Sequence, residues 1–129
     1  MTDRRRISSG GPWEASAGYS RAIVVGDACH VSGTTDAGPA GPSLNPGDAA
    51  AQARAAWAIV ERALTEAGFS LGDVVRTRMY VVSIADAPAV AAVHGEIFGD
   101  IRPASTLVQV AGLMERSLLV EVEADARRA

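Results

Sequence analysis

Two short β-prone runs, RAIVV and ACHVS, are separated only by a Gly-Asp pair. Glycine tolerates a positive φ, so this spacing is typical of a tight hairpin, with strands near 21–25 and 28–32. Later runs alternate between apolar and polar residues, which is the period of a strand with one buried face. They predict three more strands, at 73–82, 105–111 and 118–124.

Two segments repeat small and apolar residues at helical spacing. The first begins at Asp48, a residue type that caps helices, and ends at Gly68. The second covers 86–99, with an aspartate and a proline at its start and a glycine at its end. The stripes consist of Ala53, Ala56, Trp57, Val60, Leu64 and Ala67, and of Val90, Val93, His94 and Ile97. This order of elements predicts an α+β fold with helices covering a sheet.

Alternation sorts the strand residues onto two faces. Val75, Thr77, Met79 and Val81 fall on an apolar face, and Thr106 and Val108 are predicted to join them. The other face mixes apolar side chains with arginines, glutamates and a histidine, and it includes Ile23, Tyr80, Ser105, Leu107 and Leu119. That mixed face is too apolar for water and too charged for a dry core, so we expect a subunit interface with polar sites.

The segment 33–47 contains four glycines and three prolines, which excludes a regular element. Loops of this length are usually functional or mobile, and the composition favours a mobile surface loop.

Length, net charge and cysteine count limit the classes of function that the chain can have. The 129 residues suit a single domain, 1–129, and the net charge of −3 gives no general attraction to nucleic acid. We therefore interpret the arginines of DRRR, residues 3–6, as a solvated tail rather than an RNA contact. The single cysteine, Cys29, excludes an internal disulfide and suits the cytoplasm, and no apolar run is long enough to cross a membrane.

Glu121 and Glu123 lie two residues apart, and so on one face of a strand. A carboxylate there could polarise a water molecule or act as a general base. The competing interpretation, which spacing alone favours, is a pair of salt bridges to Arg76 or Arg78. His94 is predicted to be a buried histidine with a satisfied ring nitrogen, and His30 an interface residue. No motif indicates a metal or a cofactor.

Several stretches are more distinctive than these patterns: GYSRA, VSGTT, the long AAQARAAWAIVERALTEAGFSLGDVVRTRMYV, RPASTLVQVAGL and LVEVEADA. Together with the element order, the chain resembles the RidA (YjgF) family, small enamine and imine deaminases also called L-PSP or endoribonuclease-like proteins. The resemblance covers almost the whole sequence. It implies a chorismate-mutase-like sheet with two helices on one face, and a homotrimer that binds a small molecule in clefts between its subunits.

The resemblance also implies site residues. Active members line the cleft with a tyrosine, a serine, an arginine after a Pro-Ala pair, and a glutamate, which here correspond to Tyr19, Ser32, Ser105 and Glu121. The arginine is therefore replaced by Ser105, whose hydroxyl cannot make the bidentate, charge-assisted grip of a guanidinium on a carboxylate. The cysteine often found two residues later in the family is here Leu107.

These observations lead to a hypothesis: a hydrolase of imines or enamines with altered substrate specificity. In it Glu121 orients the water, and Ser32, Ser105 and Thr106 contact the ligand. Arg78 is a candidate for bringing a guanidinium into the cleft from another direction, as is Arg102. The alternative is a non-catalytic binding or sensing protein that keeps the cleft.

Overall fold

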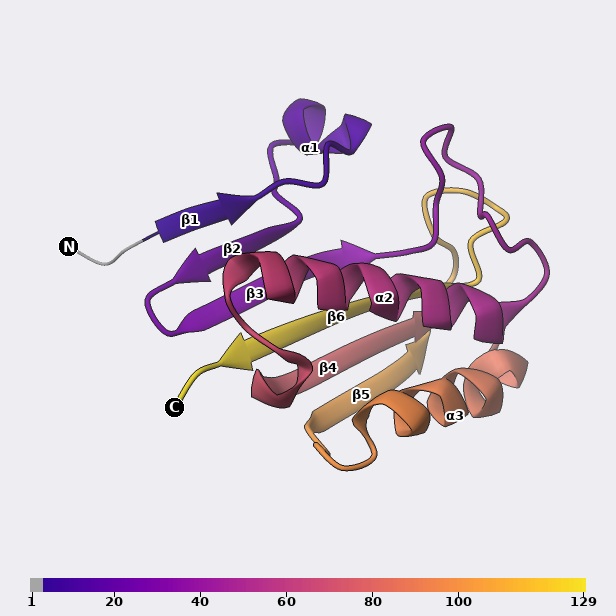
Figure 1. Ribbon diagram of the computed structural model, residues 1–129. Helices are drawn as coiled ribbons and strands as arrows, with labels where there is room; N and C mark the ends of the chain where they lie inside the picture. Colours follow the sequence, from indigo (N-terminus) through magenta and orange to yellow (C-terminus); the bar gives the residue numbers. More distant parts are fainter. Residues whose placement is uncertain (1–3) are drawn as a thin grey trace.

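The computed structural model describes residues 4–129, which form one six-stranded sheet and three α-helices (Figure 1). The elements are β1 (Arg4–Ile7), α1 (Pro12–Ala17), β2 (Ala22–Val25), β3 (Ala28–Thr34), α2 (Ala49–Ala67), β4 (Val74–Val81), α3 (Ala87–Phe98), β5 (Ala104–Gln109) and β6 (Val120–Arg127). Short 3-10 turns, Leu71–Asp73 and Ile84–Asp86, precede β4 and α3.

The strands lie in the order β1-β2-β3-β6-β4-β5. Every neighbouring pair is antiparallel except β4 and β5, which are parallel and are joined through α3. Both α2 and α3 pack on the same face of the sheet, and α1 lies beside the end of β1 (Figure 1). The predicted α+β sheet with two helices on one face is confirmed. No helix in the part described is both long and apolar enough to cross a lipid bilayer.

The helix boundaries follow the capping signals. The Asp48 side chain accepts a hydrogen bond from the Ala51 amide at 3.0 Å, and Gly68 ends α2 in the left-handed conformation at φ 88°. Asp86 occupies the N-cap position of α3 but its side chain makes no capping bond, because a 3-10 turn leads directly into the helix. The predicted stripe of α2 is buried throughout against the sheet.

The arginine run near the N-terminus is not a solvated tail. Arg4–Ile7 forms β1 and pairs with β2 in antiparallel register, and the Arg5 guanidinium donates to the Ala67 carbonyl at 2.8 Å. Asp3 lies outside the described residues. The side chains of Arg4, Arg5 and Arg6 are exposed, but the backbone belongs to the sheet. The run lacked an apolar alternation, and so gave no strand signal.

Two face assignments are also wrong. The register of β4 shifts between Val74 and Arg76, so Val74 is buried, whereas Val75, predicted for the apolar face, is 47% exposed. In β5 the two faces are exchanged, because parallel pairing places Ser105 beside Thr77, a fully buried residue of the helix-covered side.

Alternation could not orient β5, because both of its faces carry apolar residues. Leu107 packs against the core, while Val108, predicted for the apolar face, is 42% exposed. Thr106, predicted to share the apolar side, is exposed beside Arg78. Only the pairing register with β4 decides between the two orientations.

The glycine- and proline-rich loop after β3 is held by a buried carboxylate. Asp36 accepts hydrogen bonds from the Ser43 hydroxyl at 2.7 Å and from the Asn45 amide at 3.0 Å. The buried Gln52 side chain of α2 donates to the carbonyls of Asn45 and Ser117 and accepts from the Leu119 amide. The loop and the segment before β6 are therefore fixed to the same helix.

Candidate functional site

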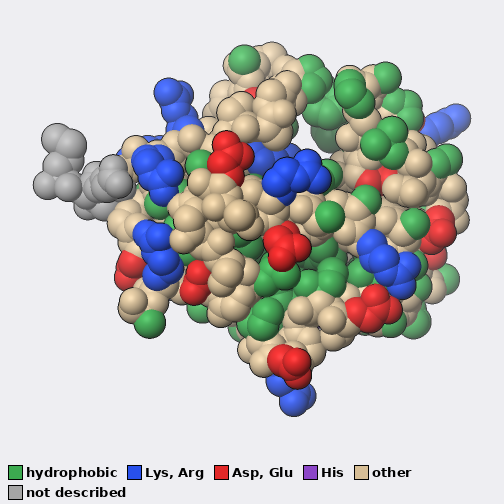
Figure 2. Space-filling model, viewed as in Figure 1, with side chains coloured by type: hydrophobic (Ala, Val, Ile, Leu, Met, Phe, Trp, Pro, Cys, Tyr) green, Lys and Arg blue, Asp and Glu red, His purple; other side chains and the backbone are tan. Residues whose placement is uncertain are grey.

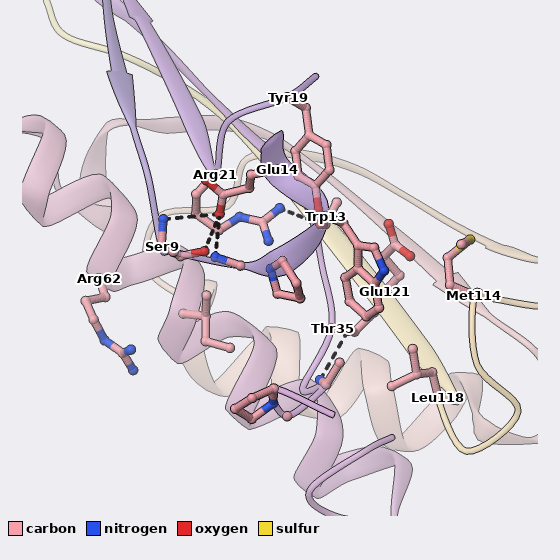
Figure 3. Close-up of a pocket in the computed structure, with 18 residues that line it drawn as sticks. Ser9, Trp13, Glu14, Tyr19, Arg21, Thr35, Arg62, Met114, Leu118 and Glu121 are labelled. Carbon is pink, nitrogen blue, oxygen red and sulfur yellow. Dashed lines mark hydrogen bonds between the residues drawn. The ribbon is translucent and has the colours of Figure 1, made fainter. Parts of the chain in front are cut away.

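A cavity of about 490 Å³ opens between α1, the end of β3, the loop that follows β3, and the segment before β6. Figure 2 shows the hollow beside the lobe formed by α1, with hydrophobic side chains gathered on the opposite rim. Its volume is in the range of small-molecule sites. The residues that line it include Trp13, Glu14, Tyr19, Arg21, Met114, Leu118 and Glu121 (Figure 3).

Glu121 reaches the cavity because of its position on β6. Its neighbours Val120 and Val122 are fully buried under the helices, so alternation turns the glutamate to the opposite side. The carboxylate lies directly against Gly33 of β3: a methyl group on Gly33 would collide with the Glu121 Oε2 atom. A glycine at this position is therefore what allows the carboxylate to occupy its place.

The Glu121 and Glu123 side chains have different partners. Glu123 accepts a hydrogen bond from the Tyr80 hydroxyl at 2.7 Å and lies 3.6 Å from Arg78, so the predicted salt bridge to Arg78 is confirmed for this residue. Within residues 4–129, no hydrogen bond or ion pair engages the Glu121 carboxylate. Burial, and then the negative charge of Glu123, raise the pKa of Glu121, against an opposing effect of Arg21.

Arg21, immediately before β2, places a half-buried guanidinium in the cavity. Its Nη2 donates to the Gly33 carbonyl at 2.6 Å, and its guanidinium carbon lies 6.0 Å from the centre of the Tyr19 ring. Burial lowers the pKa of the guanidinium, while Tyr19, Glu14 and Glu121 act in the opposite direction. The Nε atom is buried and has no acceptor in the described structure.

Glu14 of α1 lies on the other side of Arg21 and is already fully engaged. Its carboxylate accepts hydrogen bonds from the hydroxyls of Ser8 and Ser9 and from the amides of Ser9 and Gly11. Burial would raise the pKa of this carboxyl, but the bonds from Ser9 and Ser8 outweigh it and the pKa is lowered. Glu14 thus holds the start of α1 as an anion.

Of the residues predicted from the sequence, Tyr19 and Glu121 line the cavity. Ser32 faces an adjoining concavity that Tyr19 also lines, and its hydroxyl donates to the Ser20 carbonyl at 2.6 Å. These three lie at one end of the sheet. Tyr19 follows α1, Ser32 belongs to β3 and Glu121 belongs to β6.

The remaining predicted residues lie elsewhere in the chain. The Ser105 hydroxyl accepts from Thr77 at 2.8 Å, and Arg78 pairs with Asp125 at 3.1 Å. Thr106 stands beside Arg78 in the β4–β5 register. None of the three lines the cavity of a single chain.

The histidines also have partners outside the cavity. The His94 Nε2 lies 2.8 Å from the Thr77 hydroxyl, which confirms the expected partner for a ring nitrogen, but the residue is half-buried rather than buried. Partial burial lowers the pKa of the ring. His30 is exposed and pairs with Asp125 at 2.8 Å. Among residues 4–129, no group of three or more His, Cys, Asp or Glu side chains is placed to hold a metal ion.

Neither Arg21 nor Trp13 was predicted from the sequence as a site residue. A signal for Arg21 existed: it follows Tyr19 by two residues, on the mixed side of the hairpin. Trp13 gave none, because the six-residue α1 is too short to show a helical stripe.

Fold and site together define a class: a two-layer α+β protein whose small-molecule cavity holds a half-buried guanidinium and, within residues 4–129, a carboxylate without a hydrogen-bond or ion-pair partner. Residues 12–128 match the family model described as Endoribonuclease L-PSP, and the chain belongs to that family. The expected relationship to the RidA (YjgF) proteins is confirmed at the level of the family.

Solved and curated relatives agree with this assignment. The crystal structure of Rv2704 from Mycobacterium tuberculosis, described as a member of the YjgF/YER057c/UK114 family, superimposes with a TM-score of 0.89 at 44% identity, covering 98% of this chain and 100% of that one. The uncharacterized protein SCO2049 of Streptomyces coelicolor is 38% identical over 96% of this chain and 92% of its own length.

Two curated relatives with named activities are deaminases. The 3-aminoacrylate deaminase RutC of Acinetobacter baylyi is 35% identical over 82% of this chain and 83% of its own. A 2-iminobutanoate/2-iminopropanoate deaminase of Capra hircus is 32% identical over 95% and 89%. At the level of the family, the chain is therefore related to imine and enamine deaminases.

Proposed function

We propose that the protein hydrolyses the C=N bond of a small imine, or of an enamine after its tautomerisation, with Glu121 as the residue that activates water. The observation that carries this proposal is a cavity-facing carboxylate that has a raised pKa and no partner in the described structure. A carboxylate in this state can accept and return a proton near neutral pH more readily than an ordinary glutamate.

The chemistry requires one residue to act twice. The substrate reacts as its iminium form, with a proton from solvent on the nitrogen, and Glu121 takes a proton from water as the oxygen bonds to the iminium carbon to give a carbinolamine. The protonated carboxyl then returns its proton to the amino group, the C–N bond breaks as the hydroxyl gives its proton back to solvent, and ammonia leaves with formation of a carbonyl. Water is consumed, a 2-oxo acid or aldehyde and ammonia are produced, and Glu121 ends as it began.

The named relatives support a small acidic substrate. Their substrates, 3-aminoacrylate, 2-iminobutanoate and 2-iminopropanoate, each combine a carboxylate with a nearby carbon–nitrogen bond. Ser105 stands at the position where the family resemblance implies an arginine for that carboxylate. We therefore propose altered specificity, in which the ligand's acid group is bound differently.

We also propose that the active form is a homotrimer whose clefts bring β5 of one subunit beside the cavity of the next. This arrangement would place Ser105 and Thr106 near a ligand, which a single chain does not do. The exposed apolar side chains Val75 and Val108 and the open edge of β5 support an interface there. Sedimentation is expected to give three times the mass of one chain, and a monomer at micromolar concentration would contradict it.

An activity assay distinguishes a hydrolase from a protein that only binds the ligand. The replacement of the family arginine by Ser105 is the observation that favours the alternative, a non-catalytic binding or sensing protein. In an assay that generates 2-iminopropanoate with a lyase and follows its disappearance, the hydrolase proposal expects the wild type to exceed the rate in buffer. A wild type with no effect on that rate, but with ligand bound, would establish the alternative.

Ser105→Arg is the matching gain-of-function variant. A guanidinium at this position is expected to raise kcat/KM for 2-iminopropanoate about tenfold or more, since a hydrogen bond to a charged group contributes about 1.5–3 kcal/mol. The lyase-coupled assay measures it. A wild type already as fast as the variant would show that Ser105 is not what limits recognition of this substrate.

A further inference from the structure

We propose that Arg21 binds the carboxylate of the substrate, taking the role that the family resemblance gives to an arginine at the position of Ser105. This inference rests on the proposed function, since it assigns the substrate's acid group to a particular residue of the same cavity. The residue comes from a different element, the entry to β2 rather than β5. A ligand held there would approach Glu121 from another direction.

The guanidinium has donors to spare. Within residues 4–129 it makes one hydrogen bond, from Nη2 to the Gly33 carbonyl, although a guanidinium carries five N–H donors. That bond and the nearby Tyr19 ring fix its orientation while leaving other N–H groups free. Figure 3 shows the Arg21 group directed into the cavity, between Glu14 and Glu121. An anchored, partly satisfied guanidinium of this kind is suited to bind a planar anion.

Within residues 4–129, Arg21 has no contacting counter-ion. Glu14 and Glu121 are close enough to influence its charge, yet neither forms an ion pair with it in the described structure. Glu14 is committed to Ser8, Ser9 and Gly11. Keeping a half-buried cation without a contacting anion is unfavourable, and an anionic ligand would offset that cost.

Gly33 contacts both Arg21 and the proposed base, Glu121. The Arg21 guanidinium is bonded to the Gly33 carbonyl, and the Glu121 carboxylate lies against the Gly33 α-carbon. Both groups are therefore set by one residue of β3. Because both groups contact the same residue, a short ligand that carries a carboxylate near its carbon–nitrogen bond suits them. The assignment therefore favours short 2-imino acids and 3-aminoacrylate-like enamines over neutral imines.

Other arginines are less suitable. Arg78 is engaged by Asp125 and Glu123, and Arg102 does not line the cavity. Arg62 of α2 is the other lining arginine, but its side chain is exposed at the rim. Arg62 is therefore a matched control, because it offers the same charge to the same cavity from a solvated position.

The test is calorimetric titration with pyruvate, the 2-oxo acid formed from 2-iminopropanoate, and with its neutral analogue pyruvamide. Arg21→Gln is expected to weaken pyruvate binding about tenfold to a hundredfold and to leave pyruvamide unchanged. Arg62→Gln is expected to resemble the wild type. Arg21→Lys keeps the charge but not the bidentate geometry, and an intermediate affinity is expected from it even if Arg21→Gln does not fold.

Three results of the titrations would contradict the assignment of Arg21. Pyruvate binding that is unchanged in both Arg21 variants, equally weakened in Arg62→Gln, or undetectable in the wild type would overturn the assignment. Pyruvate binding that depends on Arg21 in a protein without imine hydrolysis would uphold Arg21 and remove the hydrolase proposal. Imine hydrolysis by Arg21→Gln with an unchanged KM would uphold the hydrolase proposal and remove the assignment of Arg21 to the substrate carboxylate.

Discussion

Glu121→Gln is expected to lower kcat for imine hydrolysis about a hundredfold or more and, at the same time, to make the protein more resistant to unfolding at neutral pH. The loss follows because an amide cannot accept the proton of the attacking water. The gain follows because the ionised carboxylate is partly buried, near Glu123, without a partner in the described structure. The coupled assay and a thermal melt at pH 7 measure the two effects.

The pH dependence separates this account from simple repacking. The pKa of Glu121 is raised in the fold, so its contribution to stability is most favourable below the unfolded-state value of about 4.5 and is lost as pH rises through the folded-state pKa. The stability difference between Glu121→Gln and the wild type should therefore shrink towards acid pH. The acid limb of kcat should lie above pH 4.5, since the carboxylate must be ionised to accept a proton.

Glu123→Gln is the matched control for Glu121→Gln. It removes the charge that helps to raise the pKa of Glu121, so the acid limb of kcat should move to lower pH without a comparable loss of kcat. It also removes the ion pair with Arg78 and weakens the acceptor of the Tyr80 hydroxyl, and should not stabilise the protein. If Glu121→Gln keeps the wild-type kcat, another group activates the water.

Gly33→Ala is expected to lower kcat about a hundredfold while leaving the fold intact. The backbone of Gly33 is not in the left-handed region, so alanine is tolerated there, but its methyl group would collide with the end of the Glu121 side chain. That end is flexible, so the carboxylate moves rather than the strand. A displacement of about 1 Å can cost a hundredfold in rate when reacting groups must be aligned.

The comparison for Gly33→Ala is Gly95→Ala in α3, where an added methyl group meets nothing within 4 Å. That variant should keep the wild-type kcat and gain about 0.5–1 kcal/mol of stability, because alanine favours a helix interior. Single-turnover rates and thermal melts measure both. A fully active Gly33→Ala would show that the carboxylate position against β3 is not needed for the chemistry.

Local signals in the sequence predicted α2, α3 and most strands, but not α1. Asp48 and Gly68 mark the ends of α2 because capping depends on neighbouring residues alone. Alternation also placed Val120 and Val122 inward and Glu121 outward. It failed where the arrangement depends on another strand: the irregularity at Val74, and the parallel register of β5, are set by pairing across the sheet.

The site residues, too, were predicted only in part from the sequence. Tyr19 and Glu121 were identified through the family resemblance, and the structure places both in one cavity. That the glutamates would separate, with Glu123 paired and Glu121 unpaired, could not be read from a two-residue spacing. The importance of Arg21 depends on what lies around it after folding, namely Gly33 and Tyr19. Spacing in a sequence does not contain that information.

The Gln52 side chain also has a mechanical consequence. Because one amide holds the carbonyls of Asn45 and Ser117 and the amide of Leu119, the loop after β3 and the segment before β6 share one attachment to α2. These two walls of the cavity must shift together, and with the helix, whereas α1 is attached separately through Glu14 and its serines. A bulkier ligand would thus be accommodated at the α1 side, and changes in the size of accepted substrates should arise most readily from residues 8–14.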